Sequence, residues 1–126
     1  MNKYITINKV GKFYNVYGED AIIIHYLFNY KVINRKVGFP SESLNKVKDK
    51  LNELNISYII NDNEKIEKDF GKLNKYEEYS LLANSKINTD KKIDLILKKI
   101  DKLLPKEIDE LINYINIKID KIYEAR

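Results

Sequence analysis

The chain has no cysteine and no tryptophan, and it has one histidine, two prolines and four glycines among 126 residues. The absence of cysteine excludes a disulfide framework and a thiolate metal site, and it fits a reducing cytoplasm, where we expect the protein to reside. The four glycines are scattered, so the chain lacks a glycine-rich phosphate loop. Its first residues lack the apolar stretch of a signal peptide, and its apolar runs are too short for a membrane span. We therefore expect no membrane association.

The scarcity of histidine also limits catalysis and metal binding. His25 lies in the apolar run AIIIHYLF, which favours a packed core histidine over a metal ligand or a catalytic base. Glu19 and Asp20 are candidate Mg²⁺ ligands of a nuclease-like site, with Asp62 or Glu64 as a third. Adjacent residues on a helix point about 100° apart, however, and acidic residues are favoured at a helix N-terminus. We therefore expect no enzyme activity, no catalytic residue, no cofactor and no metal, with a nuclease as a less favoured alternative.

The net charge of +4 is mildly basic. Such a charge permits a phosphate-binding surface without requiring one. Lysine, asparagine and isoleucine are all abundant, and an AT-rich coding sequence explains this bias without reference to function. Charge alone is therefore weak evidence for nucleic-acid binding.

The first half of the chain alternates between strand-like and helix-like segments. β-Branched and aromatic residues predict strands over residues 4–6, 10–17 and 56–60, and a short strand pair over residues 31–37 with NRK as its turn. An apolar run predicts a buried helix over residues 21–30, for which a strand is the alternative. Apolar residues at spacings of three and four predict an amphipathic helix over residues 44–55. This order indicates an α/β (α+β) fold with helices against a mixed sheet.

The second half is predicted to be mainly helical. Residues 61–75 resemble a polar loop, with or without a helical turn, and residues 76–83 a short helix. Asn88, Thr89 or Asp90 is expected to cap the next helix, and Pro105 is expected to end it and to begin another. Apolar stripes on both helices predict an αα-hairpin over residues 89–125 whose partner is the sheet domain, another protein or a second copy of the chain. We divide the chain into an α/β domain at 1–72 and a helical extension at 73–126.

Three segments, in order, resemble the mismatch-recognition domain at the N-terminus of the MutS family. They are GKFYNVYGEDA at residues 11–21, VGFPSESLNKVKDKL at residues 37–51 and ISYII at residues 56–60. The first is similar to the family's glycine–aromatic strand and turn, the second to its Gly-x-Pro motif with the following helix, and the third to its next strand. The resemblance covers about residues 10–61, and its specificity comes from the order and spacing of the segments.

This resemblance implies a DNA-binding role. The family inserts the first aromatic residue of the motif into the minor groove beside a mispaired base, and that position is Phe13 here. The family's base-contacting glutamate is replaced by Asn15, which keeps hydrogen-bonding groups but lacks the carboxyl group. The segment before the Gly-x-Pro motif is shorter than in the family, and the ATPase, clamp and connector domains are absent from this sequence. The resemblance therefore implies a stand-alone recognition domain without ATP-coupled signalling.

The resulting expectation is a non-catalytic protein that binds mispaired or distorted DNA through an aromatic wedge. A strand phenylalanine is more often buried, so this role requires Phe13 to be exposed and Tyr14, on the opposite face, to be buried. Gly38 and Pro40 are expected to shape the turn before the helix. The expected phosphate contacts beside the wedge are Lys12, Lys31, Arg35 and Lys36. The alternative is a protein-interaction or dimerisation module that has lost mismatch binding.

Overall fold

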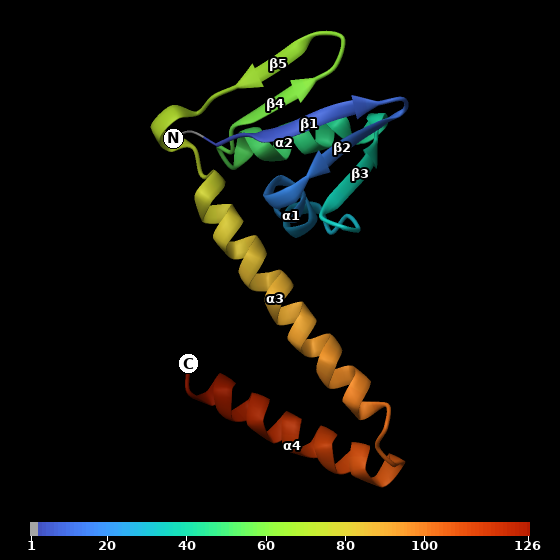
Figure 1. Ribbon diagram of the computed structural model, residues 1–126. Coiled ribbons are helices and arrows are strands. Elements are labelled where there is room, and N and C mark those ends of the chain that lie inside the picture. Colours follow the sequence, from blue (N-terminus) through green and yellow to red (C-terminus); the bar gives the residue numbers. More distant parts are fainter. Residues whose placement is uncertain (1–2) are drawn as a thin grey trace. The chain divides into compact units, whose positions relative to one another are not determined.

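The computed structural model describes residues 3–126, which contain a five-stranded mixed sheet. The strand order is β3-β2-β1-β4-β5, with β1 parallel to β4 and every other neighbouring pair antiparallel (Figure 1). The strands are β1 (Ile5–Val10), β2 (Phe13–Tyr17), β3 (Lys36–Pro40), β4 (Tyr58–Asn61) and β5 (Lys65–Lys68). The predicted mixed sheet with flanking helices is confirmed.

Four α-helices and two short 3₁₀ segments complete the described part of the chain. They are α1 (Gly18–Phe28), η1 (Ser41–Ser43), α2 (Leu44–Glu53), η2 (Gly71–Leu73), α3 (Tyr76–Ile100) and α4 (Pro105–Glu124). The chain divides into two compact units, residues 1–88 and 89–126, so the first turns of α3 belong to the unit that contains the sheet. The functional boundary predicted between residues 72 and 73 stays a prediction.

The core lies between one face of the sheet and the helices α1 and α2. Alternate residues of the strands point into it because successive side chains of a strand lie on opposite faces. The buried strand residues are Ile5, Ile7, Tyr14, Val16, Val37, Phe39, Tyr58 and Ile60. Helix α1 contributes Ala21–Ile24, and α2 contributes Val47 and Leu51 from its apolar stripe. The opposite side of the sheet, which carries Phe13, Asn15 and Tyr17 on β2, is called the open face below.

Two predicted turns have the expected chemistry. Asn34 and Arg35 both have positive φ between the bridged residues Ile33 and Lys36, which is the geometry of a two-residue hairpin turn. Asn55 follows α2 with φ of 57°, as expected of a left-handed cap. The turn at the NRK segment and the end of the amphipathic helix are therefore confirmed, whereas the strand expected before the turn is reduced to the single bridged residue Ile33.

The strand boundaries near the N-terminus differ from those predicted from sequence. The predicted strand at 10–17 is interrupted by a turn, because Gly11 has φ of +61°. Val10 therefore ends β1, and Phe13 begins β2. Gly38 and Pro40 lie within β3 rather than in a turn, paired with Asn15 and Phe13. Their expected role in shaping a turn was wrong for Gly38, while Pro40 ends the strand just before η1.

Between residues 61 and 90, the helix predicted over residues 76–83 is confirmed, but two other features differ from the prediction. The expected polar loop contains β5, whose residues KIEK are all exposed. Tertiary pairing with β4 forms this strand, and its lysines suit a sheet edge. The two helices expected on either side of residue 88 form one continuous helix, α3. Asn88, Thr89 and Asp90 lie inside it, because this segment has neither glycine nor proline to end the helix.

Candidate nucleic-acid interface

One end of the open face carries an exposed apolar row. Phe13 pairs with Val10 on one side and with Pro40 on the other, so these three residues lie on neighbouring strands at the same level. Phe13 is 53% exposed and Val10 is 55% exposed. Lys12 lies in the turn directly before Phe13, and its carbonyl accepts a hydrogen bond from the Ser41 amide at 3.0 Å. The structure thus presents an aromatic ring next to a basic residue.

The strand that carries Phe13 is held firmly from its other face. Tyr14 is 3% exposed and stacks on Phe39, with a ring-centroid distance of 5.8 Å. The Tyr14 hydroxyl donates a hydrogen bond to the Asp62 carboxylate at 2.9 Å. The expected burial of Tyr14 is therefore confirmed, and Phe13 projects from a rigid part of the sheet.

Asn15 occupies the middle of the open face. It lies between Asn8 of β1 and Gly38 of β3, and its Nδ2 donates to the Tyr17 hydroxyl at 3.4 Å. The side chain is 8% exposed, so its amide lies low between its neighbours. A Cβ atom at Gly38 would lie 3.1 Å from Asn15 Oδ1, which is closer than ordinary contact. Glycine at this position leaves space beside the Asn15 amide.

An amide row crosses the sheet at the level of Asn15. Asn8 pairs with Asn15 on one side and with Asn61 on the other, and Asn61 Nδ2 donates to Asn8 Oδ1 at 2.8 Å. This row could not be predicted from the sequence, because it depends on the register of β1 with β2 and with β4, and Asn61 lies 53 residues from Asn8 in the chain. Only the abundance of asparagine was visible, and that has a compositional explanation.

The other predicted basic residues gather at the opposite end of β2 from Phe13. Tyr17 pairs with Lys36, and Arg35 lies in the adjoining hairpin turn. The four residue-to-residue steps from Phe13 to Tyr17 span about 13 Å of strand. Of the four predicted phosphate contacts, Lys12 lies beside Phe13. Lys31, Arg35 and Lys36 lie at or just before the start of β3, which is at the opposite end of β2. Whether any of them contacts DNA stays a prediction.

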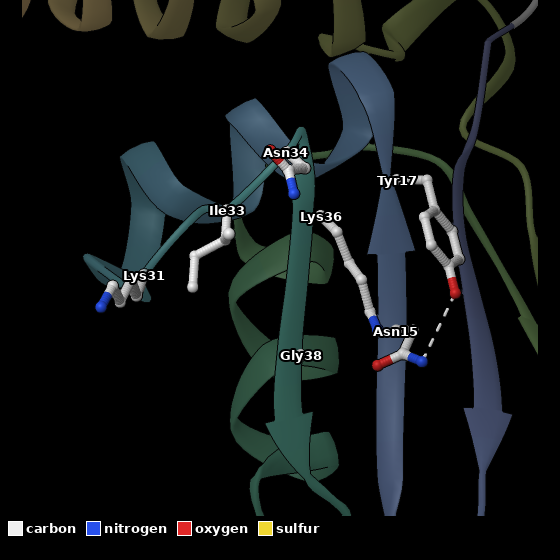
Figure 2. A pocket seen from close by; sticks show the side chains of 7 residues that line it. All are labelled: Asn15, Tyr17, Lys31, Ile33, Asn34, Lys36 and Gly38. Carbon is white, nitrogen blue, oxygen red and sulfur yellow. Dashed lines mark hydrogen bonds between the residues drawn. The ribbon is translucent and has the colours of Figure 1, made fainter.

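A pocket of about 570 Å³ lies at this second end (Figure 2). Asn15, Tyr17 and Gly38 line it from the two strands, and Lys31, Ile33, Asn34 and Lys36 line it from the hairpin. Figure 2 shows the Lys36 side chain extending along the strands toward the Asn15 amide. The pocket therefore combines two ammonium groups, amide groups and an aromatic ring.

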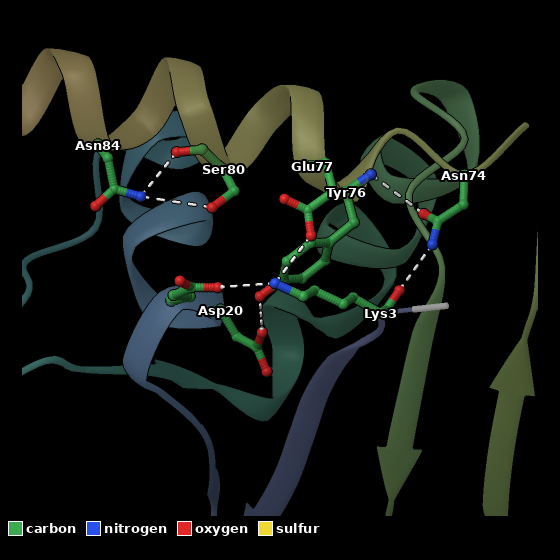
Figure 3. A network of polar contacts seen from close by, with 8 residues as sticks. Lys3, Asp20, Asn74, Tyr76, Glu77, Ser80 and Asn84 are labelled. Carbon is green, nitrogen blue, oxygen red and sulfur yellow. Dashed lines mark hydrogen bonds and ion pairs between the residues drawn. The ribbon is translucent and has the colours of Figure 1, made fainter. Parts of the chain in front are cut away.

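The acidic residues considered for a nuclease site have separate structural roles. Asp20 Oδ2 accepts a hydrogen bond from the Thr6 amide at 3.0 Å. Asp20 Oδ1 accepts a hydrogen bond from the Tyr76 hydroxyl, as Figure 3 shows. Glu19 forms an ion pair with Lys3. Among residues 3–126, no three acidic or histidine side chains gather in a way that could hold a metal ion. These contacts join the start of α1 to β1 and α3.

His25 is half-buried rather than fully enclosed in the core. Its Nδ1 lies 2.7 Å from the Tyr30 carbonyl oxygen. A carbonyl accepts and cannot donate, so Nδ1 carries a proton and donates it. This bond ties the end of α1 to the segment that follows it.

Asp20 and Asp62 are expected to affect stability in opposite directions as the pH changes. Burial raises the pKa of Asp20 in the folded protein. The contribution of Asp20 to the free energy of unfolding is therefore fully present below the pKa that this residue has in the unfolded chain, and it is lost as the pH rises through its folded pKa. The Asn63 amide and the Tyr14 hydroxyl lower the pKa of Asp62, so its contribution is lost as the pH falls through the folded pKa. The free energy of unfolding of wild type, minus that of Asp20→Asn, should therefore fall as the pH rises above about 4.

Urea unfolding of wild type, Asp20→Asn and Asp62→Asn across this range measures both effects. The free energy of unfolding of wild type, minus that of Asp62→Asn, should rise with pH, which provides an internal control of opposite sign. A difference between wild type and Asp20→Asn that does not change with pH would contradict the assignment of a raised Asp20 pKa.

The comparisons with known proteins identify the family of this fold. Residues 1–85 match the family model described as MutS domain I. The chain belongs to the MutS domain I family. The match extends beyond the segments recognised in the sequence and includes β5, η2 and the first turns of α3. No curated protein and no solved structure matches the chain significantly.

Membership of the MutS domain I family defines the function at a general level. The domain is a DNA-recognition domain rather than a catalytic one, so residues 1–85 carry a mismatch-recognition, DNA-binding fold. Across residues 3–126, none of the helices combines the length and the apolar character needed to cross a membrane. The apolar row, the amide row and the pocket all lie within the matched residues.

Proposed function

We propose that this MutS domain I protein is a non-catalytic cytoplasmic protein that binds mispaired or distorted DNA with the open face of its sheet. Phe13 acts as the wedge. The observation that carries this proposal is the exposure of Phe13, at 53%, on a strand whose next residue is buried and hydrogen-bonded. An aromatic ring held in this way is already positioned, so little conformational entropy is lost when it enters a base stack.

The preference for distorted DNA follows from the energy of unstacking. Inserting a side chain between base steps unstacks them at a cost of a few kcal/mol per step. A mispaired or unpaired base is already poorly stacked, so the same insertion costs less there. Val10 and Pro40 flank Phe13 and widen the apolar surface that the minor groove would meet.

Charge on the open face supports contact with more than one phosphate. Lys12 lies at the wedge, and Lys36 begins β3 about 13 Å away along the strand, where Lys31 lines the same pocket. On one strand of B-DNA this distance corresponds to about four base steps. Asn15 lies between the two basic ends with a donor and an acceptor, but it lacks the carboxyl group of the family's glutamate. We therefore expect weaker discrimination among mismatches than a glutamate would provide.

Substitution of the wedge tests this proposal. Phe13→Ala should weaken binding to a mismatched duplex by about 5- to 150-fold, because stacking of an aromatic side chain on a base is worth roughly 1–3 kcal/mol. Fluorescence anisotropy at fixed ionic strength would measure the dissociation constants of mismatched, fully paired and single-stranded oligonucleotides. Salt must be fixed because phosphate contacts make the affinity strongly dependent on ionic strength.

Tyr114→Ala is the matched control, since Tyr114 is an aromatic residue of α4 with 67% of its surface exposed. It should leave DNA binding unchanged. If wild type and Phe13→Ala bound the mismatched duplex equally well, Phe13 would not be the wedge. Mg²⁺-dependent cleavage of any of these oligonucleotides would instead favour a nuclease-like enzyme.

A second candidate function is self-association through residues 89–125, and the apolar stripe of α4 favours it. Five of the six isoleucines of α4 form this stripe, at spacings of four, three, four and three: Ile108, Ile112, Ile115, Ile119 and Ile122. Spacings that average 3.5 residues are typical of helices that pack along a coiled-coil seam. From Ile112 to Ile122, each of these side chains keeps at least 39% of its surface exposed. An apolar seam of this length needs a covering surface.

The chemistry of the two helices indicates a second copy of the chain as the partner. Residues 89–100 carry four basic and two acidic side chains, whereas α4 carries three basic and five acidic ones. Helices of opposite net charge attract one another when they lie side by side. Isoleucine at both seam positions favours assemblies of more than two helices. Two copies, each with two helices, would form such a four-helix bundle and cover both stripes.

A further inference from the structure

We infer that the pocket on the open face beside the start of β3 binds the base of an unpaired nucleotide in DNA, with the neighbouring phosphate on Lys31 and Lys36. This inference rests on the proposed DNA binding and adds a second binding element to it. Phe13 would open the base stack, and the pocket would hold a nucleotide that leaves it. The pocket and Phe13 do not overlap, because Phe13 is not among the residues that line the pocket.

The size and lining of the pocket suit a nucleotide. Its volume of about 570 Å³ lies within the range of roughly 300–1,000 Å³ that is usual for small-ligand sites. Asn15 offers an amide donor and acceptor, which is what the hydrogen-bonding edge of a base requires. Tyr17 is half exposed and presents its ring next to this amide. Stacking on an aromatic ring and hydrogen bonding at the base edge are the usual means of binding an unstacked base.

Gly38 is the strongest local evidence that this space is a built feature. It lies in the middle of β3 and, unlike Gly11 and Gly18, it does not have the positive φ that would explain a glycine. Glycine inside a strand lowers stability by about 0.5–1 kcal/mol relative to alanine. A side chain here would meet Asn15 Oδ1 at 3.1 Å and would project above the sheet into the pocket. The glycine therefore keeps the Asn15 amide accessible from the pocket.

The charge of the lining favours the phosphate of a nucleotide over a neutral ligand. Lys31 and Lys36 are its two ionisable cations, and the described lining residues include no carboxylate. Arg35 lies in the same hairpin turn and adds a third cation nearby. Ammonium groups at the margin of a polar pocket can contact the phosphate on either side of a base that is held inside it.

The pocket also lies at a suitable distance from the wedge. Asn15 follows Phe13 by two residues on the same face of β2, which is about 7 Å. When the Phe13 ring enters the base stack, it would thus lie close to the nucleotide that the pocket receives. A single extra nucleotide in one strand of a duplex can leave the stack without breaking a base pair, so it is the DNA structure that this arrangement fits best.

Three duplexes of one sequence test the inference: fully paired, with one extra adenosine nucleotide, and with one extra abasic nucleotide. The two extra nucleotides share the same backbone, so their affinities differ by what the base contributes. Wild type should bind the adenosine bulge about tenfold or more tighter than the abasic bulge, in line with the value of a stacked base. Gly38→Val should reduce this ratio to less than about twofold by filling the pocket, and valine is well tolerated in strands.

Tyr17→Leu provides a second variant in case Gly38→Val does not fold, which thermal unfolding would reveal. It removes the stacking ring from an exposed position and should lower the same ratio. Phe13→Ala serves as the contrasting variant, because it should weaken binding to both bulges and leave the ratio unchanged. 2-Aminopurine in place of the extra adenosine adds a direct readout, since its fluorescence rises when it leaves the base stack.

The outcomes separate the pocket from the wedge. Equal affinity of wild type for the adenosine and abasic bulges would overturn the inference while leaving DNA binding intact. Absence of binding to all three duplexes would overturn the proposed function itself. Titration with free deoxyadenosine monophosphate distinguishes the source of the nucleotide, because binding as tight as that of the bulged duplex would assign the pocket to free nucleotides rather than to DNA.

Discussion

Phe39→Ala is expected to lower the free energy of unfolding by about 3–5 kcal/mol, which is the usual cost of removing a buried phenylalanine ring. Phe39 is 1% exposed and stacks between Tyr14 and Tyr30, at ring-centroid distances of 5.8 and 5.9 Å. Alanine would leave a cavity beneath β2 and β3 and would remove both stacking contacts. Domains of this size are stable by only about 5–15 kcal/mol, so this is a large share of the total.

The same substitution should disturb the proposed DNA site from below. β3 is one of the two edge strands of the sheet, and among its residues Val37 and Phe39 are the two that are buried. Lys36 and Gly38 lie on the same strand with their positions facing the pocket. Loosening Phe39 therefore frees the strand that forms one wall of the pocket, and the preference for a base-containing bulge should fall together with stability.

Phe13→Ala is a matched control for the stability measurement, since both residues are phenylalanines on paired strands. Phe13 is 53% exposed, so its replacement should change the free energy of unfolding by no more than about 0.5 kcal/mol. Urea unfolding monitored by circular dichroism would give both values. Similar losses for the two variants would contradict the burial of Phe39 on the covered face of the sheet and the exposure of Phe13 on the open face.

Local sequence patterns predicted those parts of the fold whose signal lies in one short segment. The stripe of α2, the hairpin turn at Asn34 and Arg35, and the proline start of α4 each follow from a few adjacent residues. β5 could not be predicted in this way, because its residues are charged and its formation depends on pairing with β4. The continuity of α3 was missed because cap-forming residues also occur within helices when nothing else ends them.

The candidate site could not be predicted from any single segment of the sequence. Alternation along β2 separates Phe13 from Tyr14, but it does not say which of the two faces the helices cover. The wedge role implied by the family resemblance required Phe13 to lie on the uncovered face. The pocket required the register between β2 and β3, which places Gly38 opposite Asn15. The distance between Phe13 and Lys36 likewise follows from strand pairing rather than from their positions in the sequence.

Ile115→Asp is expected to convert a self-associated protein into a monomer. Ile115 is the central isoleucine of the α4 stripe, and a symmetric interface contains each substituted residue at least twice. Burial of one isoleucine contributes about 1.5–3 kcal/mol, so two would weaken association by more than about 100-fold. Desolvation of the new carboxylates would weaken it further. Sedimentation velocity over a range of protein concentrations would measure the change.

Ile117→Asp is the control that distinguishes the stripe from the helix as a whole. Ile117 is 57% exposed, and its place in the heptad spacing lies away from the seam that passes through Ile115. The same substitution there should leave association intact, while circular dichroism verifies that both variants keep their helices. A monomeric wild type, or equal dissociation of the two variants, would contradict the four-helix assembly. Because Phe13 lies in the other compact unit, the monomeric variant should still show a Phe13-dependent preference for mismatched DNA.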